Sequence, residues 1–142
     1  MGFTRSKANE ILNGLFPNDS TKKNYTYIAL STTEPDVNGG NVTEPSSESG
    51  YKRMKVEVMG SASNGQIKNS DIIFFPESLG EGYGTIVAFG LYSTQTGGTP
   101  YYTGMLKNAN GELAPIQVPA GYIPIFRAGA LIIGLDKDEL DV

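Results

Sequence analysis

Cysteine and histidine are both absent from this 142-residue chain. Without cysteine there is no disulfide framework, no zinc thiolate site and no cysteine nucleophile. Without histidine the chain lacks the commonest general base, every Ser-His-Asp arrangement and the usual transition-metal ligand. Only paired carboxylates are left for catalysis, and glycine on both sides of Glu81 makes Glu77 and Glu81 exposed loop acids instead. We therefore expect no enzyme, no catalytic residue and no cofactor.

Excess positive charge and long apolar runs are lacking as well. The chain has 11 Lys and Arg against 15 Asp and Glu, which gives a net charge of −4. No basic field is available to neutralise phosphates, so we do not expect nucleic acid as a partner. No stretch approaches the roughly 20 apolar residues of a membrane helix, and residues 2–7 lack the apolar run of a signal peptide. We expect a protein that is made and used without membrane insertion.

What the sequence does contain is a succession of short strand signals separated by turn residues such as Asn-Gly and Gly-Gly. A chain of this length fits one domain that buries about two-thirds of its unfolded surface. We predict an all-β fold, a single antiparallel β-sandwich of jelly-roll type over residues 1–142, with about eight short strands. The predicted strands are residues 25–31, 51–59, 71–75, 85–93, 101–106, 113–118, 122–126 and 130–135.

One short helix is predicted within residues 1–17. Thr4 is placed to cap its start, and Pro17 follows its end. Its apolar face needs a cover, which is either the protein's own sheet or a neighbouring subunit. Five apolar residues recur at helical spacing: Ala8, Ile11, Leu12, Leu15 and Phe16. The last four are candidates for a partner interface.

Two predicted strands indicate which side chains are buried. Residues 86–91 are apolar at successive positions, which is typical of a central strand covered on both faces. Along residues 51–58, charged and apolar residues alternate, so one set is expected inside and the other in solvent. The inward residues would be Met54, Val56 and Val58, and the solvent-facing ones Arg53, Lys55 and Glu57.

A long polar loop, residues 32–49, follows the first predicted strand. Glu34, Asp36 and Glu44, with carbonyl groups of the Gly-rich turn, are candidate oxygen ligands for Ca²⁺, but their spacing matches no regular calcium loop. We therefore predict an exposed, solvated acidic loop without a metal, and contact with a partner is the alternative. Residues 136–142 are expected to form a solvated acidic tail.

The chain has eight tyrosines, more than a small core requires. Tyrosine is common at interfaces because its ring buries area while its hydroxyl stays hydrogen-bonded. Tyr83, Tyr101 and Tyr102 are the candidates for a partner interface. Tyr101 and Tyr102 follow the turn at Gly97 and Gly98, where they could stack on a sugar ring, contact a subunit or simply pack across strands.

Several short motifs occur in a fixed order along nearly the whole chain. They are residues 29–35, Thr43-Glu44, Gly50-Tyr51-x-Arg53, Asn69, residues 72–76, Gly84-Thr85, residues 89–92, Gly97-Gly98, Gly104 with Leu106, Gly121, and residues 126–133. In this order they resemble a family of small tail-fibre-type structural proteins of tailed bacteriophages. The chain departs at Tyr83, where that family often has tryptophan before the Gly-Thr pair.

The resemblance implies a virion structural protein, associated with the tail fibre or the baseplate, that acts in assembly or host attachment. It implies other virion proteins as partners and the virion as location, after assembly in the bacterial host cytoplasm. The apolar residues 86–91 and the tyrosines add the expectation of a homo-oligomer. One alternative is a carbohydrate-binding module or receptor-binding tip that stacks host-surface glycans on exposed tyrosines. Another is a head-decorating fibre or capsid-associated protein.

Overall fold

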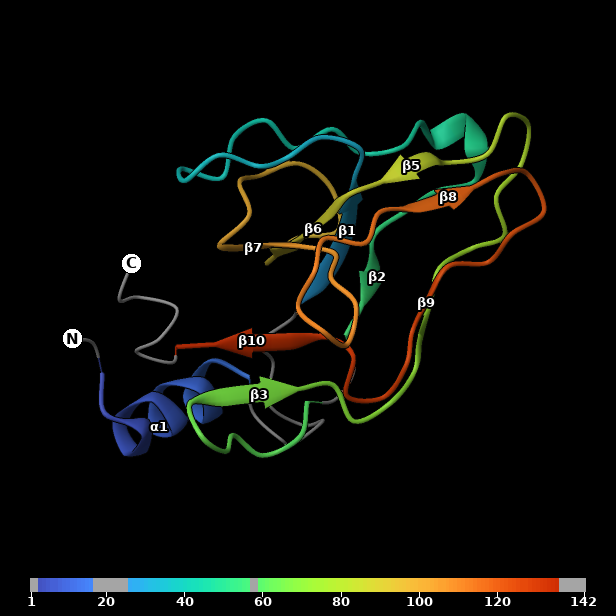
Figure 1. Ribbon diagram of the computed structural model, residues 1–142. Coiled ribbons are helices and arrows are strands. Elements are labelled where there is room, and N and C mark those ends of the chain that lie inside the picture. The colour runs from blue at the N-terminus through green and yellow to red at the C-terminus, as the bar shows by residue number, and fades with distance from the viewer. Residues whose placement is uncertain (1–2, 17–25, 57–58, 136–142) are drawn as a thin grey trace. The chain divides into compact units, whose positions relative to one another are not determined.

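The computed structural model describes residues 3–16, 26–56 and 59–135 (Figure 1). The chain forms two compact units, and segments distant in sequence contribute to each. The first contains Met1–Asn24, Val56–Ile73 and Phe126–Val142, and the second contains Tyr25–Lys55 and Phe74–Ile125. The single domain expected from the chain length stays a prediction. The predicted acidic tail, residues 136–142, lies outside the described residues.

Helix α1 (Arg5–Leu15) begins the described part of the first unit. The backbone N–H of Lys7 donates to the Thr4 hydroxyl oxygen over 3.2 Å, which satisfies one of the N–H groups that a helix start leaves unpaired. At the other end, the Phe16 N–H donates to the Leu12 carbonyl over 2.9 Å. The predicted helix and its cap are confirmed. Among the described residues, no helix has the length and apolar character needed to cross a bilayer.

The apolar face of α1 is largely buried within this chain. Ala8, Leu12 and Phe16 are at most 4% exposed, Ile11 is half-buried, and Leu15 is 52% exposed. The helix contacts strand β3 (Gln66–Lys68). Leu12 and Phe16 are therefore core side chains and not free surface. Of the four candidates for a partner interface on this helix, Leu15 is the most exposed.

A tight hairpin places β3 beside the helix. Asn64 and Gly65 have φ values of 55° and 76°, the geometry of a two-residue hairpin turn of type I′. Ser63 and Gln66 flank this turn and exchange backbone hydrogen bonds of 2.8 and 3.0 Å. Strand β3 then pairs antiparallel with β10 (Ile132–Gly134). The sequence predicts the turn but not β3, because Gln66 and Lys68 give that segment a polar composition.

Two asparagine side chains of α1 fix the helix to this hairpin. The Asn9 side-chain oxygen accepts the Gly65 N–H over 2.7 Å, and that of Asn13 accepts the Ala62 N–H over 2.9 Å. These bonds satisfy backbone groups that the tight turn leaves without a strand partner. The helix is thus positioned by polar contacts as well as by its apolar face.

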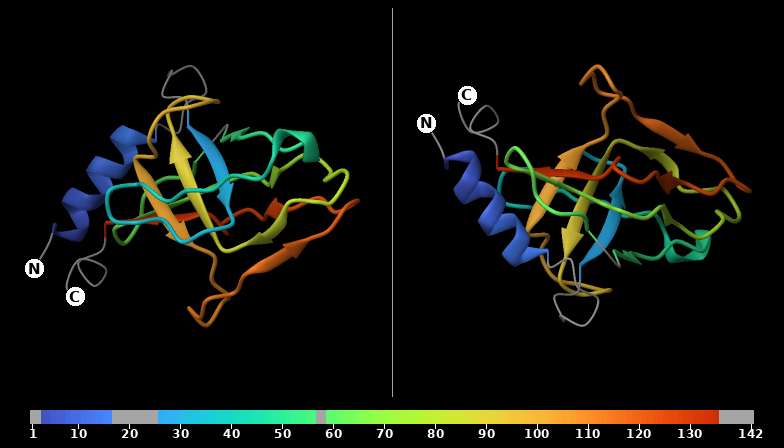
Figure 2. Two further views of the ribbon diagram at one scale, coloured as in Figure 1. Left: turned by 90° about the horizontal axis from the view of Figure 1, so that it is seen from above. Right: turned by 90° about the horizontal axis from the view of Figure 1, so that it is seen from below.

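A four-stranded antiparallel sheet forms the centre of the second unit, in the order β2-β1-β6-β7. Its strands are β1 (Tyr27–Ser31), β2 (Met54–Lys55), β6 (Ala88–Tyr92) and β7 (Tyr102–Met105). Figure 2 shows β1, β6 and β7 side by side. Every residue of β6 is buried, which confirms the central strand predicted within residues 86–91.

Glycine at position 104 makes room for the core of this sheet. Gly104 lies opposite Phe89, and a Cβ there would come within 2.6 Å of the Phe89 ring. Real Cβ contacts are longer, so any side chain would displace the ring. The Phe89 ring instead stacks on Tyr102, with ring centres 6.3 Å apart.

The other strands of the fold form two-stranded pairs. β5 (Gly84–Ile86) pairs antiparallel with β8 (Ile116–Val118), and β4 (Ile73–Phe74) pairs with β9 (Ile125–Phe126). A short 3-10 helix, η1, spans Ser47–Ser49. The predicted strand 85–93 is divided at Val87, because β5 has β8 as its partner whereas β6 joins β1 and β7.

The all-β class is confirmed, with ten short strands among the described residues instead of about eight. The jelly-roll-like sandwich stays a prediction. Among the described residues of the predicted strand 51–59, Met54 and Lys55 form β2 and Met59 forms an isolated bridge to Asn69. Lys55 is exposed and Val56 is buried, as the alternation predicts, and Met54 is half-buried. Glu57 and Val58 lie outside the described residues.

Candidate functional site

Arg53 lies in the interior of the second unit, which corrects the prediction that it faces solvent. It is 5% exposed. Its guanidinium group makes a bidentate ion pair with Glu44, in which Nε lies 2.9 Å from Oε1 and Nη2 lies 3.0 Å from Oε2. Its Nη1 donates to the carbonyl oxygens of Thr94 and Gly97, over 3.0 and 2.7 Å. A charged guanidinium group can be buried when its nitrogen atoms are all bonded in this way. The positive charge of Arg53 was therefore a poor guide to its exposure.

Two tyrosine rings complete the surroundings of the ion pair. The Tyr51 hydroxyl donates to Glu44 Oε1 over 2.6 Å and accepts the Leu30 N–H over 3.1 Å. The Arg53 Cζ atom lies 3.5 Å from the centre of the Tyr92 ring, within the range of a cation–π interaction. We term Glu44, Tyr51, Arg53 and Tyr92 the ion-pair cluster.

The cluster shifts the pKa values of its own members. Burial, followed by the Glu44 carboxylate, raises the pKa of Tyr51 far above its ordinary value, and the same two causes raise the pKa of Tyr92. Burial by itself lowers the pKa of Arg53, but the hydrogen bond and charge of Glu44 reverse this, so the pKa of Arg53 is raised. Arg53 therefore stays charged and both phenols stay protonated at neutral pH, and none of the three serves as a general base.

Hydrogen bonds between the loop and the end of β1 hold Glu44 in place. The Thr32 N–H donates to the Thr43 carbonyl over 2.9 Å, and the Thr43 N–H donates to the Ser31 hydroxyl over 3.1 Å. These bonds tie the returning end of the loop to the end of β1, one residue before Glu44. The prediction of an exposed acidic loop is wrong for Glu44, whose side chain keeps 27% of its exposure.

The three candidate metal ligands are not brought together. Glu44 is bound to Arg53, whereas Asp36 Oδ1 accepts the N–H groups of Asn38 and Gly40 over 2.9 and 2.8 Å and closes its own turn. Glu34 is exposed. Over the part of the chain that the structure describes, no three Asp, Glu, Cys or His residues are placed to hold a metal ion.

The three tyrosines predicted at a partner interface lie in different environments. Tyr83 is 3% exposed and lies edge-on to Tyr51 with ring centres 5.6 Å apart, so it is a core residue, and burial raises its pKa. Tyr102 is half-buried against Phe89. Tyr101 is 48% exposed, although its hydroxyl lies 2.8 Å from that of Thr26. Tyr101 is thus the exposed ring of the three.

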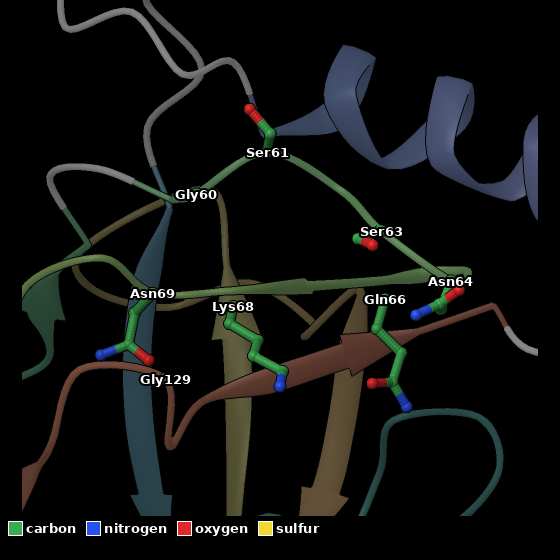
Figure 3. Close-up of a pocket in the computed structure, with 8 residues that line it drawn as sticks. All are labelled: Gly60, Ser61, Ser63, Asn64, Gln66, Lys68, Asn69 and Gly129. Atoms are coloured by element: carbon green, nitrogen blue, oxygen red, sulfur yellow. The ribbon is translucent and has the colours of Figure 1, made fainter.

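A polar hollow of about 360 Å³ lies on the first unit (Figure 3). Its walls come from the hairpin, from β3 and from the loop before β10: Gly60, Ser61, Ser63, Asn64, Gln66, Lys68, Asn69 and Gly129. Gln66 and Lys68 project from the same side of β3 in Figure 3. Their side chains, and that of Asn64, make no hydrogen bond to another described residue. The hollow offers amide, amine and hydroxyl groups, and none of the described residues that line it is aromatic.

Asn69 lies at one end of this hollow, and its side chain is bonded within the fold. It is 3% exposed, and its Nδ2 donates to the carbonyl oxygens of Asp71 and Arg127 over 2.7 and 3.0 Å. Its Oδ1 accepts the Leu131 N–H over 2.9 Å. Asn69 therefore fixes residues 127–131 beside the end of β3, and the free polar groups of the hollow are those of the hairpin and β3.

Residues 2–133 match the family described as podophage GP4 fiber I protein gp80. The chain belongs to this family. Membership confirms the resemblance to tail-fibre-type phage proteins and supports a structural fibre role in a phage. No curated protein matches the sequence.

The motifs that carry the resemblance meet in the folded fibre protein. Glu44, Arg53, Tyr92 and Gly97 come from separate motifs and converge on the ion-pair cluster. Asn69 and residues 127–131 likewise converge in the first unit. The hydrogen bonds among these motifs hold segments of the fold together. The burial of Arg53 was not predicted from the sequence. The one feature of the sequence that could have indicated it is that Arg53 belongs to one of these motifs.

Proposed function

We propose that this protein is a structural subunit of the phage tail fibre and acts by assembling with other virion proteins and with copies of itself. The observation that carries the proposal is the match to a podophage fibre family over residues 2–133. Baseplate and head positions are the alternatives that the experiment below distinguishes.

The chemistry of the second unit supports a role without catalysis. The groups with the most unusual environments, Glu44 and Arg53, are bound to each other and to backbone carbonyls. A catalytic acid or base needs a free position toward a substrate. Tyr51, Arg53 and Tyr92, whose pKa values are shifted, form contacts that stabilise the fold.

The test is to locate the protein in the particle. We expect cryo-electron microscopy of the phage, with a small tag fused to this chain, to show repeated copies of the tag on the tail fibre. Phages that lack the chain are expected to form particles without that fibre density. Tag density on the head or only at the baseplate would contradict the tail-fibre position.

The polar hollow favours a second function, binding of a host-surface glycan. Hydroxyl groups of a sugar pair well with amide and amine groups such as those of Asn64, Gln66 and Lys68, which are free among the described residues. Tyr101 and Tyr122, the exposed tyrosines among the described residues, do not line this hollow, so they do not form a stacking platform in it. Glycan-array binding that is lost in Gln66→Ala/Lys68→Ala and kept in Lys107→Ala would support this function, and no binding by the wild type would refute it.

A further inference from the structure

One segment of the second unit is exposed although it has no charged residue. Charged residues make up 18% of the chain, yet none occurs between Glu112 and Arg127. Within residues 113–125 only Val118 and Pro124 are buried. The large apolar side chains exposed on this segment are Leu113, Ile116, Tyr122, Ile123 and Ile125. We term residues 113–125 the uncharged arm.

The neighbouring segment, residues 74–79, adds to the same surface. It runs beside the arm, because the Phe75 N–H donates to the Pro124 carbonyl over 3.0 Å and the Ser78 N–H donates to the Tyr122 carbonyl over 2.9 Å. Its outward side chains include Phe74 and Leu79, which are 56% and 53% exposed. On the arm, Tyr122 and Ile123 are 60% and 53% exposed. Large apolar side chains are thus exposed on both of these adjacent segments.

Backbone hydrogen bonds hold the arm in shape without burying its side chains. Ser78 is 1% exposed, and its hydroxyl donates to the Pro119 carbonyl over 2.6 Å. Its own carbonyl accepts the Gly121 N–H over 2.8 Å. Further along the arm, β8 is paired with β5 (Figure 1). The apolar surface is therefore preformed, so little conformational entropy is lost when a partner covers it.

The size of the surface suits a subunit contact. A large aromatic side chain buries about 150 to 250 Å² when it is fully covered, and the exposed side chains of the arm and of residues 74–79 are each close to half exposed. Together they leave several hundred Å² of apolar surface in water, which is the range of functional patches on soluble proteins. A standard interface takes about 800 Å² from each partner, so this surface would supply its apolar centre and the flanking polar residues its rim.

We infer that the uncharged arm, together with residues 74–79, is the surface through which copies of this chain associate. The net charge of −4 makes two copies repel each other, and like charges that face each other across an interface are costly. A contact between two identical chains therefore forms best where neither carries charge, and the arm is such a place. A basic partner protein would instead favour the acidic parts of the surface. This inference rests on the proposed function, since a fibre subunit is present in several copies.

The first test compares the same substitution inside and outside the arm. Ile123→Asp/Ile125→Asp places charge on the exposed arm, whereas Val37→Asp makes the same kind of change at a residue that is 100% exposed on another loop. In sedimentation experiments we expect wild type and Val37→Asp to form one oligomer of the same size. The double variant should dissociate to the 15.2 kDa monomer, with a dissociation constant raised by about 100-fold or more. Circular dichroism checks that all three chains are folded.

The second test uses the absence of cysteine from the natural chain. Ile123→Cys and Val37→Cys each introduce one thiol, and a short bismaleimide reagent reports whether two such thiols approach each other. We expect covalent dimers from Ile123→Cys and almost none from Val37→Cys. Equal yields from the two variants would overturn the inference.

Two further outcomes separate the inference from the proposed function. A wild-type chain that stays monomeric at high concentration overturns the inference, even if Ile123→Asp/Ile125→Asp fails to enter particles, because the arm would then bind a different virion protein. Absence of the chain from purified particles would refute the proposed function. The sedimentation result would still show whether copies associate through the arm.

Discussion

The ion-pair cluster and the uncharged arm belong to the same unit. The cluster buries charged groups, whereas the arm exposes apolar ones. The cluster puts a carboxylate and a guanidinium group inside, where Arg53 is 5% exposed. The arm puts Ile123 and Tyr122 outside, at 53% and 60% exposure. Each arrangement is unfavourable unless another contact compensates for it.

The difference lies in where that compensation is found. The chain itself supplies partners for the buried charges, since Arg53 bonds to Glu44, to Thr94 and to Gly97. The described residues of the chain leave large apolar side chains of the arm, such as Tyr122 and Ile123, exposed. A feature that the chain satisfies by itself explains folding, whereas one that it leaves unsatisfied indicates a contact outside the chain. This is why we assign the cluster to the scaffold and the arm to assembly.

The largest effect is expected when the cluster is broken. Arg53→Met removes the guanidinium group, so the Glu44 carboxylate loses its charge partner and the carbonyl oxygens of Thr94 and Gly97 each lose one donor. Loss of one partner of a buried ion pair costs about 3 to 5 kcal/mol. We expect the lower part of that range in chemical denaturation, because Glu44 keeps 27% of its exposure.

Two controls belong to this measurement. Lys52→Met removes an exposed cation next to the cluster and is expected to change the free energy of unfolding by less than about 0.5 kcal/mol. Glu44→Gln/Arg53→Met removes both charges and should recover part of the loss. If Arg53→Met and Lys52→Met have the same free energy of unfolding, the cluster does not stabilise the fold. The contrast between cluster and arm would then be wrong.

Tyr51→Phe tests the cluster with a smaller change. It removes the hydroxyl group that donates to Glu44 and leaves the buried Leu30 N–H without its acceptor, which costs about 1 to 3 kcal/mol. The raised pKa of Tyr51 also predicts the pH dependence. The folded protein keeps this phenol protonated, whereas in the unfolded chain it titrates near pH 10.

The sign of the pH effect follows from linkage. The contribution of Tyr51 is fully present below about pH 10 and is lost as the pH rises above that value, because only the unfolded chain then releases the proton. Urea denaturation from pH 7 to 11 should therefore show the gap between wild type and Tyr51→Phe narrowing above pH 10. Tyr122→Phe, which removes an exposed hydroxyl on the arm, is the control and should follow the wild type. A gap that stays constant up to pH 11 would show that Tyr51 does not titrate in this way.

The elements that could be predicted from sequence are those set by local chemistry. Thr4 and the helical spacing of Ala8, Leu12 and Phe16 predict α1, and the Asn64-Gly65 pair predicts its hairpin turn. Continuous apolar residues predict the buried strand β6. Each of these depends on residues only a few positions apart.

The elements that could not be predicted depend on distant contacts. Arg53 is buried because its partners include carbonyl groups 41 and 44 residues away in sequence. Ile123 and Ile125 have the composition of a buried strand, yet the fold exposes them. Whether a charged or apolar side chain is covered depends on which segments fold around it, and sequence spacing does not fix that.

Ser78→Ala tests how the arm is held. The serine hydroxyl donates to the Pro119 carbonyl, and its loss should cost about 1 kcal/mol. The Gly121 and Tyr122 amides are expected to exchange hydrogen faster, while the amide of Leu30, at the ion-pair cluster, is unchanged. Ser93→Ala removes an exposed hydroxyl group and serves as the control. Faster exchange at Leu30 as well would mean that arm and cluster unfold together.

The smallest effect is expected for a change on the arm itself, provided that the chain is dilute. Ile123→Ser alters a side chain that is 53% exposed and should change the free energy of unfolding by no more than about 0.5 kcal/mol when the protein is monomeric. At high concentration, association of folded chains raises the melting temperature of the wild type, because the partner binds only the native state. Ile123→Ser should lose that rise, whereas Val37→Ser should keep it. Melting curves over a wide range of protein concentration test both statements, and a variant that is already less stable when dilute would place Ile123 in the core of the unit and not on an open surface.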